Sequence, residues 1–144
     1  MEITFQSEGV RHPQINENKL SQWIESVANK HDREIGEISY LFCDDEKILE
    51  VNQEYLNHDF FTDIITFDYS EENTISGDII ISLQTVESNS QMYKTEYTEE
   101  LHRVIIHGIL HLCGLNDLTE EEENAMRDAE DSALEMLFPK GTIE

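Results

Sequence analysis

TEELHRVIIHGILHLCG, residues 98–114, is a strongly apolar stretch that has a helix start at one end and a helix stop at the other. Thr98 and the apolar residues from Leu101 onward mark the start. Gly114 marks the stop, because glycine readily adopts the left-handed conformation that ends many helices. The stretch therefore predicts a buried helix.

The same helix carries two histidines four residues apart, His107 and His111. Residues at this spacing share one helix face, so both rings can reach one metal ion. Gly114 lets the chain turn back sharply, which brings Asp117 within reach as a third ligand. Asn116 is the neighbouring alternative, although an amide is a poorer zinc ligand than a carboxylate. The pattern predicts zinc on His107, His111 and Asp117, with a fourth position open to water.

A histidine pair at this spacing also occurs in apolar helices that bind no metal, and this alternative stays open. Two features favour the metal. The glycine and the acid follow at suitable offsets, and both histidines lie within the very apolar run VIIHGILHL. Burying an unpaired imidazole there would be costly, and metal ligation removes that cost.

Gly108 stands where a zinc protease of the His-Glu-x-x-His type has its glutamate, which takes a proton from water. Glycine cannot act as that base, so this route to peptide hydrolysis is disfavoured. A phosphodiester needs Lewis-acid polarisation and a cation near the developing charge instead. We also expect glycine at this position to let a bulky substrate approach the helix backbone.

Hydrophobic periodicity predicts the other elements. Strands are expected at residues 2–6, 37–43, 62–69 and 77–84, the last two as an antiparallel hairpin, and helices at 15–31, 44–56 and from Thr119 onward. Residues 85–95 are ambiguous between a short helix and a loop. Thr119 and Glu122 predict a capping box for the last helix. The order predicts an α+β fold with a mixed four-stranded sheet packed with helices and a zincin-like metal-binding helix.

Each helix is expected to bury one face. The inward residues are predicted to be Leu20, Trp23, Ile24, Val27 and Ala28 in the first helix, Ile48, Leu49, Asn52 and Tyr55 in the second, and Met126, Ala129, Ala133, Leu134 and Leu137 in the last.

The 144 residues suit a single domain, 1–144, and the net charge of −23 is extreme for that length. The charge argues against non-specific binding of nucleic acid, but a divalent metal reverses the local sign, so a metal-centred nuclease is still allowed. Two cysteines are too few for a disulfide framework. The absence of a secretion signal and of a membrane span predicts a cytoplasmic location.

Several separate motifs resemble the YbeY family of bacterial endoribonucleases. The family signature, His-Gly-x-Leu-His-Leu-x-Gly-Tyr-Asp-His, matches HGILHLCG at its first eight positions, and the last three differ. GDIIIS, residues 77–82, is similar to another family strand. Further matches in the same order are Asn52, Tyr55, Thr62, Asp63, Phe67, Glu100, Leu101, Met126 and Glu130.

The resemblance implies a metal-dependent endoribonuclease for single-stranded RNA, acting in small-subunit ribosomal RNA maturation and ribosome assembly. It implies one zinc ion per chain, and ribosomal RNA and small-subunit ribosomal proteins as partners, with neither DNA nor a membrane. The third family histidine falls on Asp117, whose carboxylate is a competent and harder ligand. The nucleophile is either water or the RNA 2′-hydroxyl, and the sequence leaves both open.

The functional arginine of the family falls on Leu56, so its phosphate-binding cation is missing from the usual place. Arg103, one helical turn before His107, is our candidate for the phosphate contact, and a salt bridge to Glu99 or Glu100 is the alternative. His58 is a further polar candidate that otherwise reads as a surface-loop histidine. Two other functions stay open: a metal-dependent hydrolase of peptide or another substrate, and a non-catalytic, metal-stabilised ribosome-assembly factor.

Overall fold

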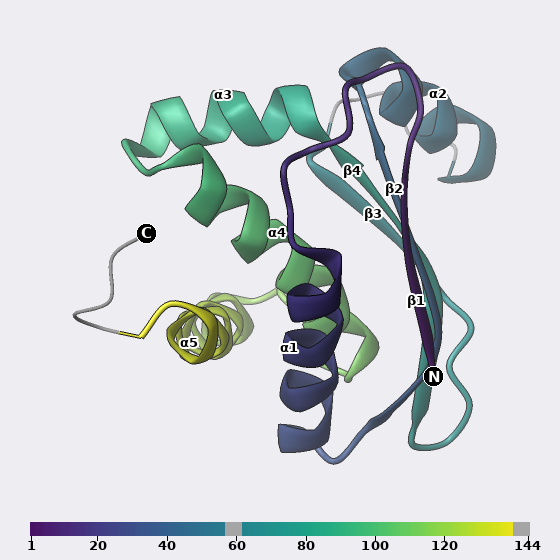
Figure 1. Cartoon of the computed structure of the whole chain (residues 1–144), viewed down its shortest axis with the longest axis vertical. Coiled ribbons are helices and arrows are strands. Elements are labelled where there is room, and N and C mark those ends of the chain that lie inside the picture. The colour runs from purple at the N-terminus through teal and green to yellow at the C-terminus, as the bar shows by residue number, and fades with distance from the viewer. Residues whose placement is uncertain (57–61, 140–144) are drawn as a thin grey trace.

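The computed structural model describes residues 1–56 and 62–139, which form a four-stranded mixed sheet with helices packed on it (Figure 1). The strands are β1 (Glu2–Ser7), β2 (Glu34–Cys43), β3 (Ile64–Asp68) and β4 (Thr74–Ser82). Their order in the sheet is β1-β2-β4-β3. The β1–β2 and β2–β4 pairs are parallel, whereas β3 and β4 form the predicted antiparallel hairpin. The α+β fold with a mixed sheet is confirmed.

The helices of the described chain are α1 (Glu17–Lys30), α2 (Asp45–Leu56), α3 (Leu83–Tyr93), α4 (Tyr97–Leu112) and α5 (Glu120–Leu137). Figure 1 shows α1, α4 and α5 on one side of the sheet, where they enclose the main hydrophobic core. A smaller cluster lies between α2 and the sheet and consists of Cys43, Ile48, Val51, Ile65 and Ile80. No helix within residues 1–56 and 62–139 is both long and apolar enough to cross a membrane.

The predicted helix faces are confirmed for α1, whose five expected residues are all buried. In α5 the capping box of Thr119 and Glu122 is present, and four of the expected residues are buried, with Ala129 partly so. The prediction for α2 is wrong at Tyr55, whose side chain is exposed, and Val51 is buried in its place. Tyr55 instead makes an edge-on ring contact with Phe67.

Helix α4 is the element that joins the sheet to the other helices. It begins at Tyr97, with Glu96 as the N-cap residue, one residue before the predicted start. Most of the ambiguous segment 85–95 belongs to helix α3, which begins at Leu83, so the strand predicted at 77–84 ends two residues earlier than expected. The Ser82 side chain caps α3 by accepting from the backbone N–H of Thr85. The buried face of α4 packs on the sheet and on α3 and α5.

Gly108 allows α4 to lie close to the sheet, and the expectation that it faces the substrate is wrong. Its backbone is buried, and a Cβ placed there would lie 3.0 Å from Ile79 and 3.2 Å from Ile64. These contacts are tighter than ordinary van der Waals packing, so a larger residue would push the helix away from the strands. The glycine therefore serves helix–sheet packing.

Candidate metal centre

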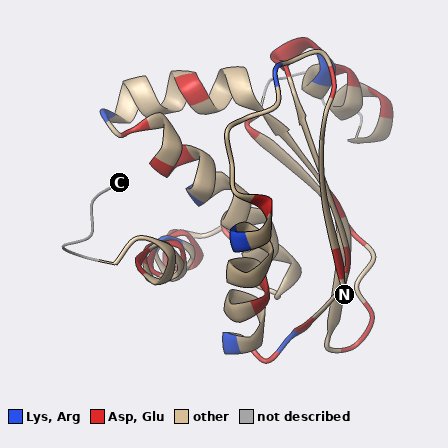
Figure 2. Ribbon diagram, viewed as in Figure 1, with Lys and Arg blue, Asp and Glu red and all other residues tan. Residues whose placement is uncertain are grey.

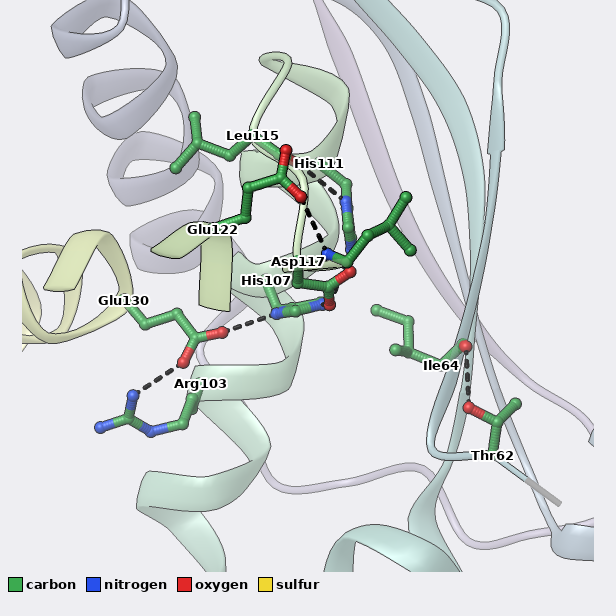
Figure 3. Close-up of polar contacts among 10 residues, drawn as sticks. Thr62, Ile64, Arg103, His107, His111, Leu115, Asp117, Glu122 and Glu130 are labelled. Carbon is green, nitrogen blue, oxygen red and sulfur yellow. Dashed lines mark hydrogen bonds and ion pairs between the residues drawn. The ribbon is translucent and has the colours of Figure 1, made fainter. Parts of the chain in front are cut away.

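His107, His111 and Asp117 come together at the C-terminal end of α4, as their spacing predicted. One ligand atom from each lies within 4.8 Å of the other two. Oδ2 of Asp117 is 3.5 Å from Nε2 of His107 and 3.5 Å from Nε2 of His111. Figure 3 shows the Asp117 carboxylate next to the two imidazole rings.

The turn that returns Asp117 to the helix is a Schellman motif. The N–H of Gly114 donates to the carbonyl of His111, and the N–H of Leu115 donates to the carbonyl of Leu110. Gly114 has a φ of 104°, in the region that favours glycine. The predicted helix stop is confirmed, and it orients the three residues that lead to Asp117.

Each histidine is held at its other ring nitrogen by a group that accepts a hydrogen bond. Nδ1 of His111 lies 2.9 Å from the carbonyl oxygen of Leu115, and Nδ1 of His107 lies 2.6 Å from Oε2 of Glu130. A carbonyl oxygen can only accept, so Nδ1 of His111 carries the hydrogen. In the neutral ring this leaves the lone pair on Nε2, on the side of Asp117. Metal-binding histidines in proteins are commonly arranged in this way.

Two of the three separations among these atoms match the spacing of ligands around one zinc ion. Tetrahedral ligands bound at about 2.0–2.2 Å from zinc lie roughly 3.3–3.5 Å from one another. The two Nε2–Oδ2 distances of 3.5 Å agree with that spacing. Two imidazoles and one carboxylate form a donor set that zinc accepts, with a fourth position available. The residues therefore fit the ion that the sequence predicted.

The three residues line a cleft of ≈ 490 Å³ between α4 and the hairpin strand β3. Its opposite wall comes from Thr62, Asp63, Ile64, Thr66 and Asp68. Figure 3 shows Thr62 and Ile64 on the far side of the gap from the histidines. Asn116 also lines the cleft, next to Asp117. The described lining residues include three carboxylates and no lysine or arginine.

The charges around the cleft shift several pKa values. Burial raises the pKa of Asp63, although the nearby His107 partly offsets that effect. Burial disfavours the charged His107 ring, but the hydrogen bond and charge of Glu130 outweigh it and raise the pKa of His107. Burial also disfavours the Glu130 carboxylate, and its bonds to His107 and Arg103 outweigh this, so its pKa is lowered. The contact between His107 and Glu130 therefore favours the charged form of each group.

Arg103, the expected phosphate contact, has both of its terminal nitrogens on carboxylates of α5. Nη1 lies 2.8 Å from Glu130 and Nη2 lies 2.7 Å from Asp131. Neither of the alternative partners, Glu99 and Glu100, forms this pair. Arg103 is not among the residues that line the cleft with the histidines. His58, the other polar candidate, lies outside the described residues.

The family model of endoribonuclease YbeY matches residues 3–137 of the chain. An endoribonuclease YbeY of Bacteroides fragilis is 57% identical over 136 residues, which cover 94% of this chain and 98% of the relative. The chain belongs to the endoribonuclease YbeY family. A YbeY of Porphyromonas gingivalis is 55% identical over 135 residues, covering 94% of this chain and 89% of that one. A solution structure of a Thermotoga maritima protein matches with a TM-score of 0.68 and 25% identity, covering 94% and 89% of the two chains.

YbeY membership agrees with the resemblance that the motifs indicated, but one important contact escaped sequence reasoning. Glu130 matched a family position, yet no role was assigned to it. The sequence feature that could have identified Glu130 is its spacing in α5, four residues after the buried Met126 and four before the buried Leu134, which places it on the inward face of the helix. A carboxylate among apolar inward residues needs polar partners, and Glu130 finds them in Arg103 and His107 of α4.

Proposed function

We propose that this YbeY-family protein is a metal-dependent endoribonuclease that cleaves single-stranded RNA during small-subunit ribosomal RNA maturation and ribosome assembly. The enzymatic class rests on family membership, since relatives more than half identical over nearly the whole chain are endoribonucleases by name. The metal site is proposed to consist of His107, His111 and Asp117 and to hold one zinc ion.

The observation that carries the proposal is the convergence of three ligand atoms beside a cleft. Both histidines direct Nε2 towards Asp117, and acceptors at Nδ1 favour that arrangement. When bound, a divalent ion supplies Lewis-acid polarisation of the scissile phosphate. The chain itself supplies the fixed geometry, because two ligands lie on one rigid helix and the third on a turn locked by Gly114.

The shape of the site argues against a peptidase of the His-Glu-x-x-His type. Position 108 is packed against Ile79 and Ile64, so it has no room for a glutamate facing the metal. A phosphodiester does not require that residue. Its phosphate needs electrostatic stabilisation at the ion, and its attacking hydroxyl is either water or the RNA 2′-hydroxyl.

The acidic character of the chain indicates how RNA is brought to the site. Figure 2 shows acidic segments on most helices and loops and few basic ones. With a net charge of −23 and no cation among the described lining residues, the cleft repels a bare polyanion. We therefore propose that basic proteins of the small ribosomal subunit bind the protein and help to neutralise the RNA phosphates.

The same observation favours a second candidate function. A cleft with three carboxylates and without a phosphate-binding cation suits a metal-stabilised assembly factor that no longer cleaves RNA. Leu56, which stands at the position of the family's functional arginine, also favours the assembly-factor function. The two candidates differ in whether the purified protein cuts RNA once its metal site is filled.

A cleavage assay distinguishes these functions. Wild type, metal-stripped protein and protein restored with zinc are incubated with single-stranded RNA, double-stranded RNA and casein. The proposal predicts zinc-dependent cutting of single-stranded RNA that is lost in Asp117→Ala and retained in Asp128→Asn, a change at an exposed carboxylate of α5. Zinc binding without RNA cleavage would support the assembly factor, and zinc-dependent digestion of casein alone would support the peptidase.

A further inference from the structure

One buried carboxylate connects the metal-site helix to α5. Glu130 is 7% exposed, and its two oxygens accept from two side chains of α4. Oε2 lies 2.6 Å from Nδ1 of His107, and Oε1 lies 2.8 Å from Nη1 of Arg103. Figure 3 shows Glu130 between the two, with His107 on the side of Asp117 and Arg103 on the other.

The chemistry of the two neighbours determines which residue can lie between them. A guanidinium has five N–H donors and no acceptor, so Oε1 of Glu130 must accept from Arg103. Oε2 then faces Nδ1 of His107 as a second acceptor. An ionised carboxylate is the only side chain of this length that can accept at both ends, and it requires the hydrogen of His107 to be on Nδ1.

We infer that Glu130 and Arg103 are positioning residues of the metal centre, an inference that rests on the proposed metal role of His107. Glu130 fixes the ring orientation and tautomer of His107, so that Nε2 offers its lone pair beside Asp117. Arg103 holds the other oxygen of Glu130, and Asp131 holds the second nitrogen of Arg103 at 2.7 Å. Arg103 thereby acts through Glu130, which lies 27 residues further along the chain.

Glutamine at position 130 tests this relation because it has nearly the same shape but only one acceptor. Its carbonyl oxygen is drawn to the charged guanidinium of Arg103, which leaves the amide NH₂ facing His107. The amide donates, so Nδ1 must become the acceptor and the hydrogen moves to Nε2. That tautomer presents a hydrogen, and no lone pair, to the metal position. Removing Arg103 as well frees the glutamine to turn its oxygen towards His107.

The first readout is the tautomer of His107 in metal-free protein, measured by long-range proton–nitrogen NMR correlation at a pH where the ring is neutral. We expect Nδ1–H in wild type, Nε2–H in Glu130→Gln, and a return to Nδ1–H in the double variant Glu130→Gln/Arg103→Met. This readout does not depend on zinc, so it decides the positioning role even if the proposed function fails. Nδ1–H in Glu130→Gln would overturn the inference.

The second readout is the affinity for zinc alone, measured by competition with a chelating dye. Loss of a group that orients a ligand typically costs about 10- to 100-fold in metal affinity, and we expect that range for Glu130→Gln. The double variant should recover part of the loss, whereas a merely structural role would make it worse than either single change. Asp128→Asn, the control, removes an exposed carboxylate of α5 that does not contact Arg103 or Glu130 and should leave zinc affinity nearly unchanged.

If Glu130→Gln fails to fold, the single variant Arg103→Met still tests the inference. Arg103→Met retains both oxygens of Glu130, so the inference predicts an unchanged Nδ1–H tautomer and a smaller loss of zinc affinity. An Nε2–H tautomer in that variant would contradict it. Wild type that binds no zinc but shows Nδ1–H would refute the proposed metal site and leave the positioning relation standing.

Discussion

The carbonyl oxygen of Leu115 lies 2.9 Å from Nδ1 of His111, so the turn that ends α4 also orients one of its histidines. The same turn carries Asp117 back to within 3.5 Å of Nε2 of that ring. One short segment therefore supplies both the carbonyl that orients the His111 ring and the carboxylate proposed as the third metal ligand. The conformation of Gly114, at a φ of 104°, makes this return possible.

Gly114→Ala should weaken both the fold and the metal site. A Cβ at this position has room, since its nearest neighbour is Nη2 of Arg33 at 3.7 Å, so the cost comes from the backbone conformation. For a residue with a side chain that conformation costs about 1–2 kcal/mol. We expect a loss of this size in urea unfolding, together with weaker zinc binding because Leu115 and Asp117 shift.

Gly9→Ala is the matched control. Gly9 has a φ of 72°, and its nearest neighbour would be Asp44 at 3.8 Å, away from the cleft. The two substitutions introduce similar backbone strain, but only the one at Gly114 should reduce zinc affinity. Equal zinc affinity in both variants would show that the turn does not position the ligands.

Gly108→Glu, which installs the glutamate of the proteases, should damage the fold and create no peptidase. Its side chain would collide with Ile79 and Ile64 and would bury a charge without a partner. Overpacking together with an unpaired buried charge predicts a loss of about 3 kcal/mol or more. Gly108→Ala should cost less, because the better helix propensity of alanine offsets part of the crowding. A stable Gly108→Glu protein that digests casein would refute this packing account.

His102 should make the metal-free protein sensitive to acid. The ring lies between Trp23 and Phe138, and its Nδ1 donates to the carbonyl of Thr98. Burial lowers the pKa of His102, although the bond to Thr98 partly offsets this. Because the folded state has the lower pKa, the unfolded chain takes up the proton first as the pH falls through about 6.5. Stability from this group is therefore present at neutral pH and is lost in acid.

The comparison with His102→Gln isolates that contribution. We expect the difference in unfolding free energy between wild type and variant to favour wild type most above pH 7. It should shrink steadily towards pH 5, measured by urea titration at each pH. Parallel curves for the two proteins across this range would show that His102 does not account for the acid sensitivity.

Both cysteines should be inert in the folded protein. Cys43 and Cys113 are buried free thiols, and burial raises the pKa of Cys43 to about 12 and of Cys113 to about 11. Reaction with a disulfide reagent requires the exposed thiolate. At pH 8 we expect almost no reaction in native protein and two thiols per chain in denaturant. Rapid native reaction of either cysteine would contradict its burial.

Sequence patterns were sufficient for the elements whose signal is local. Apolar spacing located α1 and α5, the capping box located the start of α5, and Gly114 located the end of α4. Tyr55 was misplaced because a short helix offers few turns from which to judge its buried face. Parallel pairing of β2 with both β1 and β4 joins strands far apart in the chain, and no local pattern reveals it.

The residues of the candidate site also differ in whether a local sequence pattern predicts them. The grouping of His107, His111 and Asp117 follows from helix geometry and one glycine, so spacing was enough. The partner of Arg103 was not predictable, because Glu130 lies 27 residues further on and meets it only after α5 packs on α4. The packing role of Gly108 is not predictable from sequence, because no local pattern shows that Ile64 and Ile79 of the β3–β4 hairpin lie against it.

The metal content of wild type and of Asp117→Ala, measured by mass spectrometry after purification without chelator or metal-affinity resin, tests the central claim most directly. The account predicts one zinc ion per wild-type chain and a large loss in Asp117→Ala, with Asp128→Asn keeping its zinc. Wild type without metal, or Asp117→Ala with as much zinc as wild type, would contradict the three-ligand site.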